Sequence, residues 1–300
     1  MEADRIFWKK FKMVKNYLSL IKFSHTIFAM PFALIGFCLG IIYQSGSLVS
    51  GKEIGIKLAL VIVCMVTARS AAMAFNRYLD RAIDARNPRT AIREIPAGVI
   101  NARSALVFTI VSCLLFILST WFINRICFYH SPVALAVVLG YSYTKRFTAL
   151  CHIILGLGLS LAPIGAFLAV TGYFDLLPIL FSIAVICWVS GFDIIYALQD
   201  EEFDRSHNLF SIPAKLGKVR ALHISEVLHG LSAAAIIYAG ITGGFHVFYW
   251  IGVSLFTGML VYQHSVVKPN DLRRVNLAFM TANGIASVIF AVFVIIDLFI

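Results

Sequence analysis

Charged residues are scarce in this chain of 300 residues. They make up 13% of it, about half of the ~25% usual in soluble domains, whereas hydrophobic residues make up 60% against a usual ~45–50%. A soluble fold of this composition would have to expose large apolar patches. The composition therefore excludes soluble globular, disordered and fibrous proteins. Together with the mean hydropathy of +0.88, it predicts an all-α polytopic membrane protein.

Paired cysteine motifs are also absent. None of the six cysteines forms a CxxC pair, and all of them lie in or beside apolar runs, so free thiols are expected. No small-residue cleavage site follows the first apolar run. Residues 1–22, which carry several lysines, are therefore predicted to remain as a cytoplasmic amphipathic lead-in.

Nine apolar runs are long enough, or nearly so, to cross a bilayer as helices. We expect one bundle of about nine transmembrane helices around a central cavity, with these runs as its helices: 23–43, 55–75, 103–123, 126–141, 151–171, 177–199, 221–241, 246–264 and 277–299.

Lysine and arginine are distributed unevenly among the segments that connect these runs. All but Lys52, Lys57 and Arg125 lie in the N-terminal segment or in and beside the even-numbered connections. The positive-inside rule therefore predicts a cytoplasmic N-terminus and cytoplasmic loops at 76–102 and 200–220. The net charge of +10 is explained by this placement, and no nucleic-acid partner is expected.

Two acidic clusters follow the second and sixth runs. Asn76, Asp80 and Asp84 are spaced four residues apart, so a continuing helix places them on one face. Asp193, Asp200 and Asp204 also return to nearly one direction at helical periodicity. Asp193 would lie near membrane depth, where a carboxylate is costly and usually marks function.

Carboxylate and amide oxygens are ligands that suit Mg²⁺. Substrate phosphate oxygens commonly complete the coordination shell of such an ion. Two facing acidic ridges would therefore hold Mg²⁺ ions bridged by a diphosphate. Arg69 shares the face of Asn76 and Asp80, and Arg81, Lys145 and Arg146 add positive charge at the same level.

Less specific interpretations remain open at this stage. The loop aspartates could be solvated charges paired with Arg77, Arg81 and Arg205. Asp193 and Arg69 could form a structural ion pair within the membrane, and Lys145 with Arg146 could be a membrane anchor.

These residues resemble the UbiA superfamily of intramembrane aromatic prenyltransferases. The family's NxxxDxxxD pattern is matched by Asn76, Asp80 and Asp84, and its second aspartate motif by Asp193, Asp200 and Asp204. Further matches are the arginine seven residues before the motif asparagine and the Tyr-x-Lys-Arg loop, here Arg69, Tyr143, Lys145 and Arg146. The resemblance covers essentially the whole chain and looks closest to the 4-hydroxybenzoate polyprenyltransferase branch. Arg77 departs from the pattern, because many members carry Asp there.

The resemblance implies a single transmembrane prenyltransferase domain over residues 1–300. By this resemblance, the residues that would hold Mg²⁺ on a polyprenyl diphosphate are Asn76, Asp80, Asp84, Asp200 and Asp204. Arg81, Lys145 and Arg146 would bind the phosphate oxygens and stabilise the departing diphosphate. An aromatic ring carbon would then attack the allylic cation, with Asp193 orienting the phenol or accepting its proton.

The same resemblance implies an aromatic carboxylate as acceptor. Lys22 and Arg69 are candidates to bind its carboxylate, with Tyr143 as a further substrate-binding residue. His25 is another candidate, and a packed or interfacial histidine is the alternative at that position. The apolar prenyl tail would run between helices toward the lipid bilayer.

Three alternatives compete with this interpretation. The acceptor could be 1,4-dihydroxy-6-naphthoate on a route to menaquinone, in place of 4-hydroxybenzoate on a route to ubiquinone. The chain could instead be an ion-coupled transporter, but its acidic groups gather at one membrane face. An alcohol phosphotransferase would need a DGxxAR-type run, which the sequence lacks. We therefore expect a Mg²⁺-dependent enzyme of the inner (plasma) membrane whose active-site mouth is cytoplasmic.

Overall fold

The computed structural model describes residues 15–21, 28–44 and 50–300. Within these residues the protein is helical and has no β-strand, as the composition predicted. Most of the predicted lead-in and the candidates Lys22 and His25 lie outside the described residues.

The first five described helices of the bundle each overlap one of the predicted apolar runs. They are α2 (Met30–Tyr43), α3 (Gly51–Arg86), α4 (Ala102–Ile123), α5 (Arg125–Thr144) and α6 (Cys151–Thr171). Polar side chains cap three of them: Ser50 accepts from the Glu53 amide, Asn101 from Arg103, and Asn124 from Cys127. The α3 helix continues well beyond its apolar run, which carries the first acidic motif into regular helix.

The remaining helices carry the second acidic motif. They are α7 (Leu176–Ala197), the 3₁₀ turn η2 (Leu198–Asp200), α8 (Glu201–Ser206), α9 (Ile212–Gly243), α10 (Val247–Val266), the π-helical turn η3 (Leu277–Ala282) and α11 (Asn283–Phe299). Non-helical backbone at Gly217, with φ of 79°, divides α9 into a short first segment and a long second one. The predicted run 221–241 coincides with the second segment.

Seven helices in the described part of the chain are long and apolar enough to cross a membrane. The other two predicted spans also form helices, but α2 is shorter and α10 is not among the seven. The structure therefore confirms a polytopic helical bundle, whereas the number nine stays a prediction.

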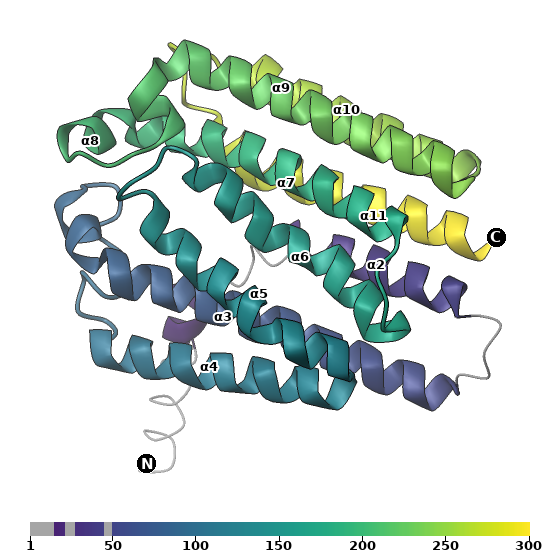
Figure 1. Cartoon of the computed structure of the whole chain (residues 1–300). Helices are drawn as coiled ribbons and strands as arrows, with labels where there is room; N and C mark the ends of the chain where they lie inside the picture. Colours follow the sequence, from purple (N-terminus) through teal and green to yellow (C-terminus); the bar gives the residue numbers. More distant parts are fainter. Residues whose placement is uncertain (1–14, 22–27, 45–49) are drawn as a thin grey trace, which may run out of the picture.

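The long helices run side by side along one direction (Figure 1). The α3–α6 helices form one half of the bundle, and α7, α9, α10 and α11 form the other. The halves are joined where α6 packs on α7, and also by α2, which packs against both α6 and α11. The loop after α3, the loop after α5 and α8 lie at the same end of the bundle, which we call the motif end; the C-terminus lies at the opposite end (Figure 1).

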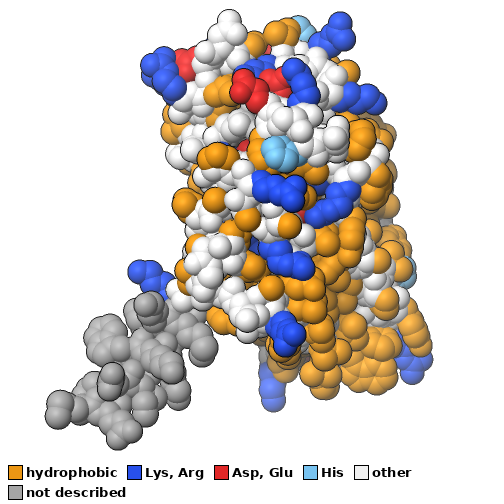
Figure 2. Space-filling view, turned by 90° about the vertical axis from the view of Figure 1, so that its left-hand side faces the viewer, with side chains coloured by type: hydrophobic (Ala, Val, Ile, Leu, Met, Phe, Trp, Pro, Cys, Tyr) orange, Lys and Arg blue, Asp and Glu red, His pale blue; other side chains and the backbone are white. Residues whose placement is uncertain are grey.

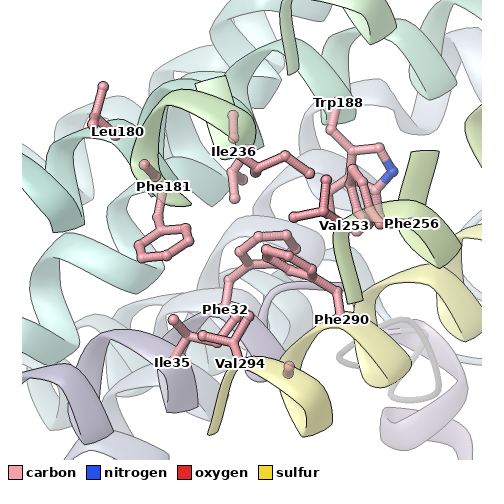
Figure 3. Close-up of a cluster of buried hydrophobic side chains, with 14 of the residues drawn as sticks. Phe32, Ile35, Leu180, Phe181, Trp188, Ile236, Val253, Phe256, Phe290 and Val294 are labelled. Atoms are coloured by element: carbon pink, nitrogen blue, oxygen red, sulfur yellow. The ribbon is translucent and has the colours of Figure 1, made fainter. Parts of the chain in front are cut away.

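The second half of the bundle has a solid aromatic core. Phe32 of α2 lies 5.3 Å from Trp188 of α7 and 5.8 Å from Phe290 of α11 between ring centroids, and all three rings are fully buried (Figure 3). Phe256 of α10 completes this contact with its ring 5.3 Å from that of Phe290. Such packing gives α7 a rigid support, and α7 carries Asp193.

Large apolar side chains cover much of the outer surface. On α4, for example, Leu114, Trp121 and Phe122 are each more than 60% exposed. Viewed toward the motif end, Lys and Arg side chains lie scattered among apolar ones, with a few Asp and Glu side chains among them (Figure 2). This surface is that of a helical protein embedded in lipid, with its polar groups concentrated at the ends of the helices.

Candidate active site

The α3 helix presents the first acidic motif from one face, as its spacing predicted. The Asp80 and Asp84 residues are only 1% and 3% exposed. The Asn76 amide Nδ2 donates to Asp80 Oδ2 at 3.1 Å. Asp80 and Asp84 are therefore buried at the motif end, and the partly exposed Asn76 binds Asp80 there.

Two cations from the loop after α5 bind the Asp80 carboxylate. Lys145 Nζ lies 2.5 Å from Oδ2, and Arg146 Nη2 lies 2.8 Å from Oδ1. Arg146 is held in place because its Nη1 donates to the Ser142 carbonyl at 2.8 Å. The sequence placed Lys145 and Arg146 at the level of the motif, and the structure shows that both reach the same carboxylate.

The Asp84 carboxylate has a cation on one oxygen only. Arg93 Nη1 lies 2.6 Å from Oδ1, whereas Oδ2 is buried and has no hydrogen-bond partner within the described residues. A buried acceptor without a donor is unfavourable unless a cation or water satisfies it. This oxygen is thus available to a further cationic group.

The second motif contacts the loop after α3 through Asp200. Arg89 forms a two-point ion pair with Asp200, and Asn87 Nδ2 donates to Asp200 Oδ1 at 3.1 Å. Burial acts to lower the pKa of the Arg89 guanidinium, but the hydrogen bond and charge of Asp200 outweigh it and raise that pKa. Because Asn87 and Arg89 directly follow α3, the ends of the two motif-bearing segments are in contact.

Lys145 also connects Asp80 with the segment that leads into α9. The Phe210 backbone amide donates to the Lys145 carbonyl at 2.7 Å. Asp204 lies within electrostatic range of both Lys145 and Asp200. The loop after α5 therefore lies between the first motif and the second.

Asp193 pairs with a histidine of the neighbouring helix. His152 Nδ1 lies 2.7 Å from Asp193 Oδ2, and the His152 side chain is almost fully buried. The predicted alternative of an intramembrane pair between Asp193 and Arg69 is not the pairing that forms.

An apolar cavity of about 340 Å³ lies among α3, α4, α5 and α6. Arg69 and Tyr141 lie at its motif end, whereas Thr120 and His130 lie toward the other end of the helices. The Nε atom of Arg69 is buried and has no hydrogen-bond partner in the described part of the chain. Tyr141 lines the cavity and lies close enough to Asp80 and Asp193 to interact electrostatically with both.

The remaining predicted residues lie toward the outside of this cluster. Arg81 is exposed, and its Nη1 donates to the Tyr78 carbonyl at 2.7 Å. Tyr143 is 46% exposed, and its ring packs 5.8 Å from that of Phe75. The guanidinium of Arg146 lies 5.9 Å above the Tyr143 ring, which connects this tyrosine with the cations on Asp80.

The oxygen ligands of the cluster fit Mg²⁺ chemically. They are carboxylates and an amide, and Asp84 Oδ2, which no described residue binds, offers a buried acceptor. No group of three or more His, Cys, Asp or Glu side chains in the described residues is arranged to hold a metal by itself. Lysine and arginine side chains instead neutralise these carboxylates, and substrate phosphate oxygens would be needed to complete a metal shell.

Sequence reasoning missed several residues of the cluster. It counted Arg89 and Arg93 only as loop charges, and it assigned nothing to Asn87, Tyr141 or His152. Tyr141 was detectable, because it lies four residues before Lys145 on the same helix face. The others carry no local signal, since their partners lie on other segments. The ion pairs also differ from the alternative in which Arg77, Arg81 and Arg205 pair with the loop aspartates. Arg205 instead binds Glu201, Arg89 binds Asp200, and Arg93 binds Asp84.

Comparison with known proteins assigns the same family that the motifs indicated. Residues 29–285 match the UbiA prenyltransferase family. A 4-hydroxybenzoate octaprenyltransferase of Tolumonas auensis is 30% identical over 224 residues, which are 74% of this chain and 78% of that protein.

Two solved structures share the fold. A UbiA homolog from Aeropyrum pernix K1 is 31% identical, with a TM-score of 0.80 over 91% of this chain and 98% of that one. A UbiA homolog from Archaeoglobus fulgidus, solved with DMAPP and Mg²⁺, is 20% identical, with a TM-score of 0.71 over 95% of this chain and 99% of that one. The chain is therefore an enzyme and a multi-pass membrane protein, and it belongs to the UbiA prenyltransferase family.

Proposed function

We infer that the enzyme transfers a polyprenyl group from a polyprenyl diphosphate to 4-hydroxybenzoate or a similar aromatic acid, with Mg²⁺ and with release of diphosphate. The observation that carries this inference is the position of the cation–carboxylate cluster around Asp80, at the motif end of the apolar cavity. The similarity to the Tolumonas 4-hydroxybenzoate octaprenyltransferase and the Mg²⁺ and DMAPP bound to the Archaeoglobus homolog support it.

The polar cluster suits the diphosphate head of the donor. Lys145, Arg146 and Arg81 would bind its oxygens as charge-assisted donors. The metal ligands would be Asn76, Asp80, Asp84, Asp200 and Asp204. When bound there, Mg²⁺ would act as a Lewis acid that stabilises the departing diphosphate. The lysine and arginine side chains that now neutralise Asp80 would then be free to bind phosphate.

The apolar cavity suits the prenyl tail. Its lining is formed almost entirely by apolar side chains such as Met65, Phe116 and Val137. Such a lining excludes water, which would otherwise quench an allylic cation. The bond between the prenyl carbon and oxygen would break with its electron pair leaving on the diphosphate.

The acceptor would enter between the cluster and the cavity. Arg69 carries a buried guanidinium whose Nε has no partner among the described residues, and it would pair with the acceptor's carboxylate. Lys22, His25 and Tyr143 are the further substrate-binding candidates. Asp193 would accept the phenolic proton as the ortho carbon attacks, and the resulting dienone would return to a phenol by moving its ring proton to the oxygen.

The membrane setting follows from the same arrangement. We place the motif end on the cytoplasmic side of the inner (plasma) membrane, because the loops there carry most of the Lys and Arg. A soluble aromatic acid would reach the cluster from that side, and the donor's tail would stay in the bilayer.

Product analysis tests the proposal directly. Purified protein with Mg²⁺, geranyl diphosphate and 4-hydroxybenzoate should form a prenylated acid, detected by mass spectrometry, and release diphosphate. EDTA or Asp200→Asn should lower the rate at least 100-fold. Glu202→Gln is the matched control, because Glu202 is an exposed acid two residues away.

Three outcomes separate the possibilities. Product with 1,4-dihydroxy-6-naphthoate alone would keep the chemistry and change the acceptor. Diphosphate release that persists in Asp200→Asn and in EDTA would contradict the assigned metal site. Absence of product with both acids would contradict the proposed function.

A further inference from the structure

His152 lies in the first turn of α6 and has no part in the chemistry described so far. The His152 residue is 3% exposed, whereas the side chain of the neighbouring Asp193 is 23% exposed. A buried imidazole beside an accessible carboxylate raises the question of what the histidine does for the carboxylate.

Three contacts hold the His152 imidazole and backbone in place. Nδ1 lies 2.7 Å from Asp193 Oδ2, and the backbone amide of Ile212 donates to Nε2 at 3.3 Å. The Ser190 hydroxyl donates to the His152 carbonyl at 3.1 Å. Because Nε2 accepts a hydrogen bond, the proton of the neutral ring is on Nδ1, and Nδ1 donates it to Asp193.

The packing of α6 on α7 sets this geometry. A Cβ atom at Gly156 would lie 2.6 Å from both the Ile186 carbonyl oxygen and Ser190 Oγ. The two helices therefore approach closely one turn after His152 and one turn before Asp193. The start of α9 closes the third side, since Ile212 is its first residue.

The Asp193 carboxylate has one oxygen bound by His152 and is partly exposed. His152 takes Oδ2, which leaves Oδ1 for another donor. Tyr141, which lines the cavity, is within electrostatic range of Asp193. A purely structural ion pair would have no need of an accessible carboxylate, whereas a carboxylate that receives a substrate hydroxyl must be accessible and held in a fixed orientation.

We propose that His152 is a positioning residue that fixes Asp193 through its Nδ1–H, so that Asp193 Oδ1 faces the acceptor's phenolic hydroxyl. The inference rests on the proposed function, because it assigns Asp193 to the acceptor. His152 does not touch either substrate and exchanges no proton with them. Its substitution therefore changes the rate of transfer and leaves donor binding as it is.

Two amide substitutions show which ring nitrogen of His152 the rate of transfer depends on. In His152→Asn the amide nitrogen takes the place of Nδ1 and can still donate to Asp193, whereas in His152→Gln it takes the place of Nε2. With geranyl diphosphate, Mg²⁺ and the accepted aromatic acid, we expect kcat of His152→Asn to stay within about threefold of wild type. We expect kcat of His152→Gln and His152→Ala to fall at least tenfold.

Further readouts separate positioning from stability. The KM for geranyl diphosphate should change less than about twofold in all three variants, and Asp193→Asn should lose no further activity when His152→Ala is added. Thermal unfolding in detergent identifies variants that fail to fold. If His152→Ala fails to fold, the comparison of His152→Asn with His152→Gln still tests the proposal.

The outcomes are distinct for the two proposals. Equal kcat in the Asn and Gln variants, or full kcat in His152→Ala, overturns the positioning role while leaving the transferase reaction intact. A large rise in donor KM overturns it too. If the wild-type protein prenylates neither aromatic acid, the proposed function and the positioning role that rests on it are both overturned.

Discussion

At the scale of single residues, the motif end is organised by cations that reach carboxylates from other segments. Asp80 is paired with two cations from the loop after α5, and Asp84 and Asp200 each have one from the loop after α3. Four basic groups therefore pair with three buried or half-buried acids, and Asp204 lies near the same group of charges. Basic side chains at a site of low dielectric constant interact strongly with an anionic substrate.

Lys145 should therefore contribute more to donor binding than to folding. We expect Lys145→Met to raise the KM for geranyl diphosphate about tenfold, equivalent to about 1.4 kcal/mol, because one charge-assisted contact is lost. Arg103→Met is the matched control, since Arg103 is an exposed arginine at the start of α4. Steady-state kinetics with varied donor would measure both, and an unchanged KM in Lys145→Met would remove Lys145 from the phosphate site.

At the scale of helices, close packing of small residues decides where the polar side chains meet. A Cβ atom at Gly191 of α7 would overlap the ring of His229 on α9. His229 itself is buried and hydrogen-bonded to His264 of α10 at 2.9 Å. The ring has little freedom to move aside, so α7 and α9 depend on glycine at this contact.

Gly191→Ala should consequently destabilise the protein by about 1–3 kcal/mol through overpacking. Gly230→Ala on α9 is the matched control, because nothing lies within 4 Å of its Cβ position and alanine favours a helix. Thermal unfolding in detergent micelles would compare them. A midpoint for Gly191→Ala at or above that of wild type would contradict the close contact.

One face of the α5 helix lines the cavity, and another face is exposed. Ala134 lines the cavity, whereas Ala136 is exposed and does not. We expect Ala134→Phe to reduce turnover of long polyprenyl donors at least tenfold more than turnover of geranyl diphosphate, because the added ring fills the cavity. Ala136→Phe should leave the ratio unchanged, and a competition assay with mixed chain lengths would measure it. Equal loss for all donors in Ala134→Phe would exclude this cavity as the tail site.

At the scale of the whole molecule, the two halves of the bundle differ in how they are filled. The α7, α9, α10 and α11 half is packed solid by aromatic rings around Trp188, and the α3–α6 half contains the cavity. The rigid half holds Asp193 and Asp200, and the hollow half holds Asp80 and Asp84. The two halves therefore each carry one acidic motif to the motif end of the bundle.

The orientation of the molecule can be tested by labelling. Single cysteines replacing Val99 and Val247, which are 52% and 70% exposed, would lie at opposite ends of the bundle. With the native cysteines replaced, a membrane-impermeant maleimide should label position 99 in inside-out vesicles and position 247 in intact cells. The reverse pattern would contradict a cytoplasmic motif end.

The sequence determined the features that depend on local physics. Apolar runs specify helices in lipid because backbone groups there must be satisfied internally, and the spacing of Asn76, Asp80 and Asp84 places them on one helix face. The uneven distribution of lysine and arginine and the family resemblance were likewise readable without coordinates. The exact number of spans was not, because α2 and α10 differ from the other helices in length or hydropathy.

Only the tertiary structure decided which side chains meet across helices. His152 and Asp193 are 41 positions apart, and Arg89 and Asp200 are 111 apart, so no local periodicity relates them. Their contacts arise where helices approach closely, as at Gly156, and from the loops that those helices bring together. Helix propensity and solvation act within one segment, whereas the pairing of buried charges is selected by packing among many segments at once.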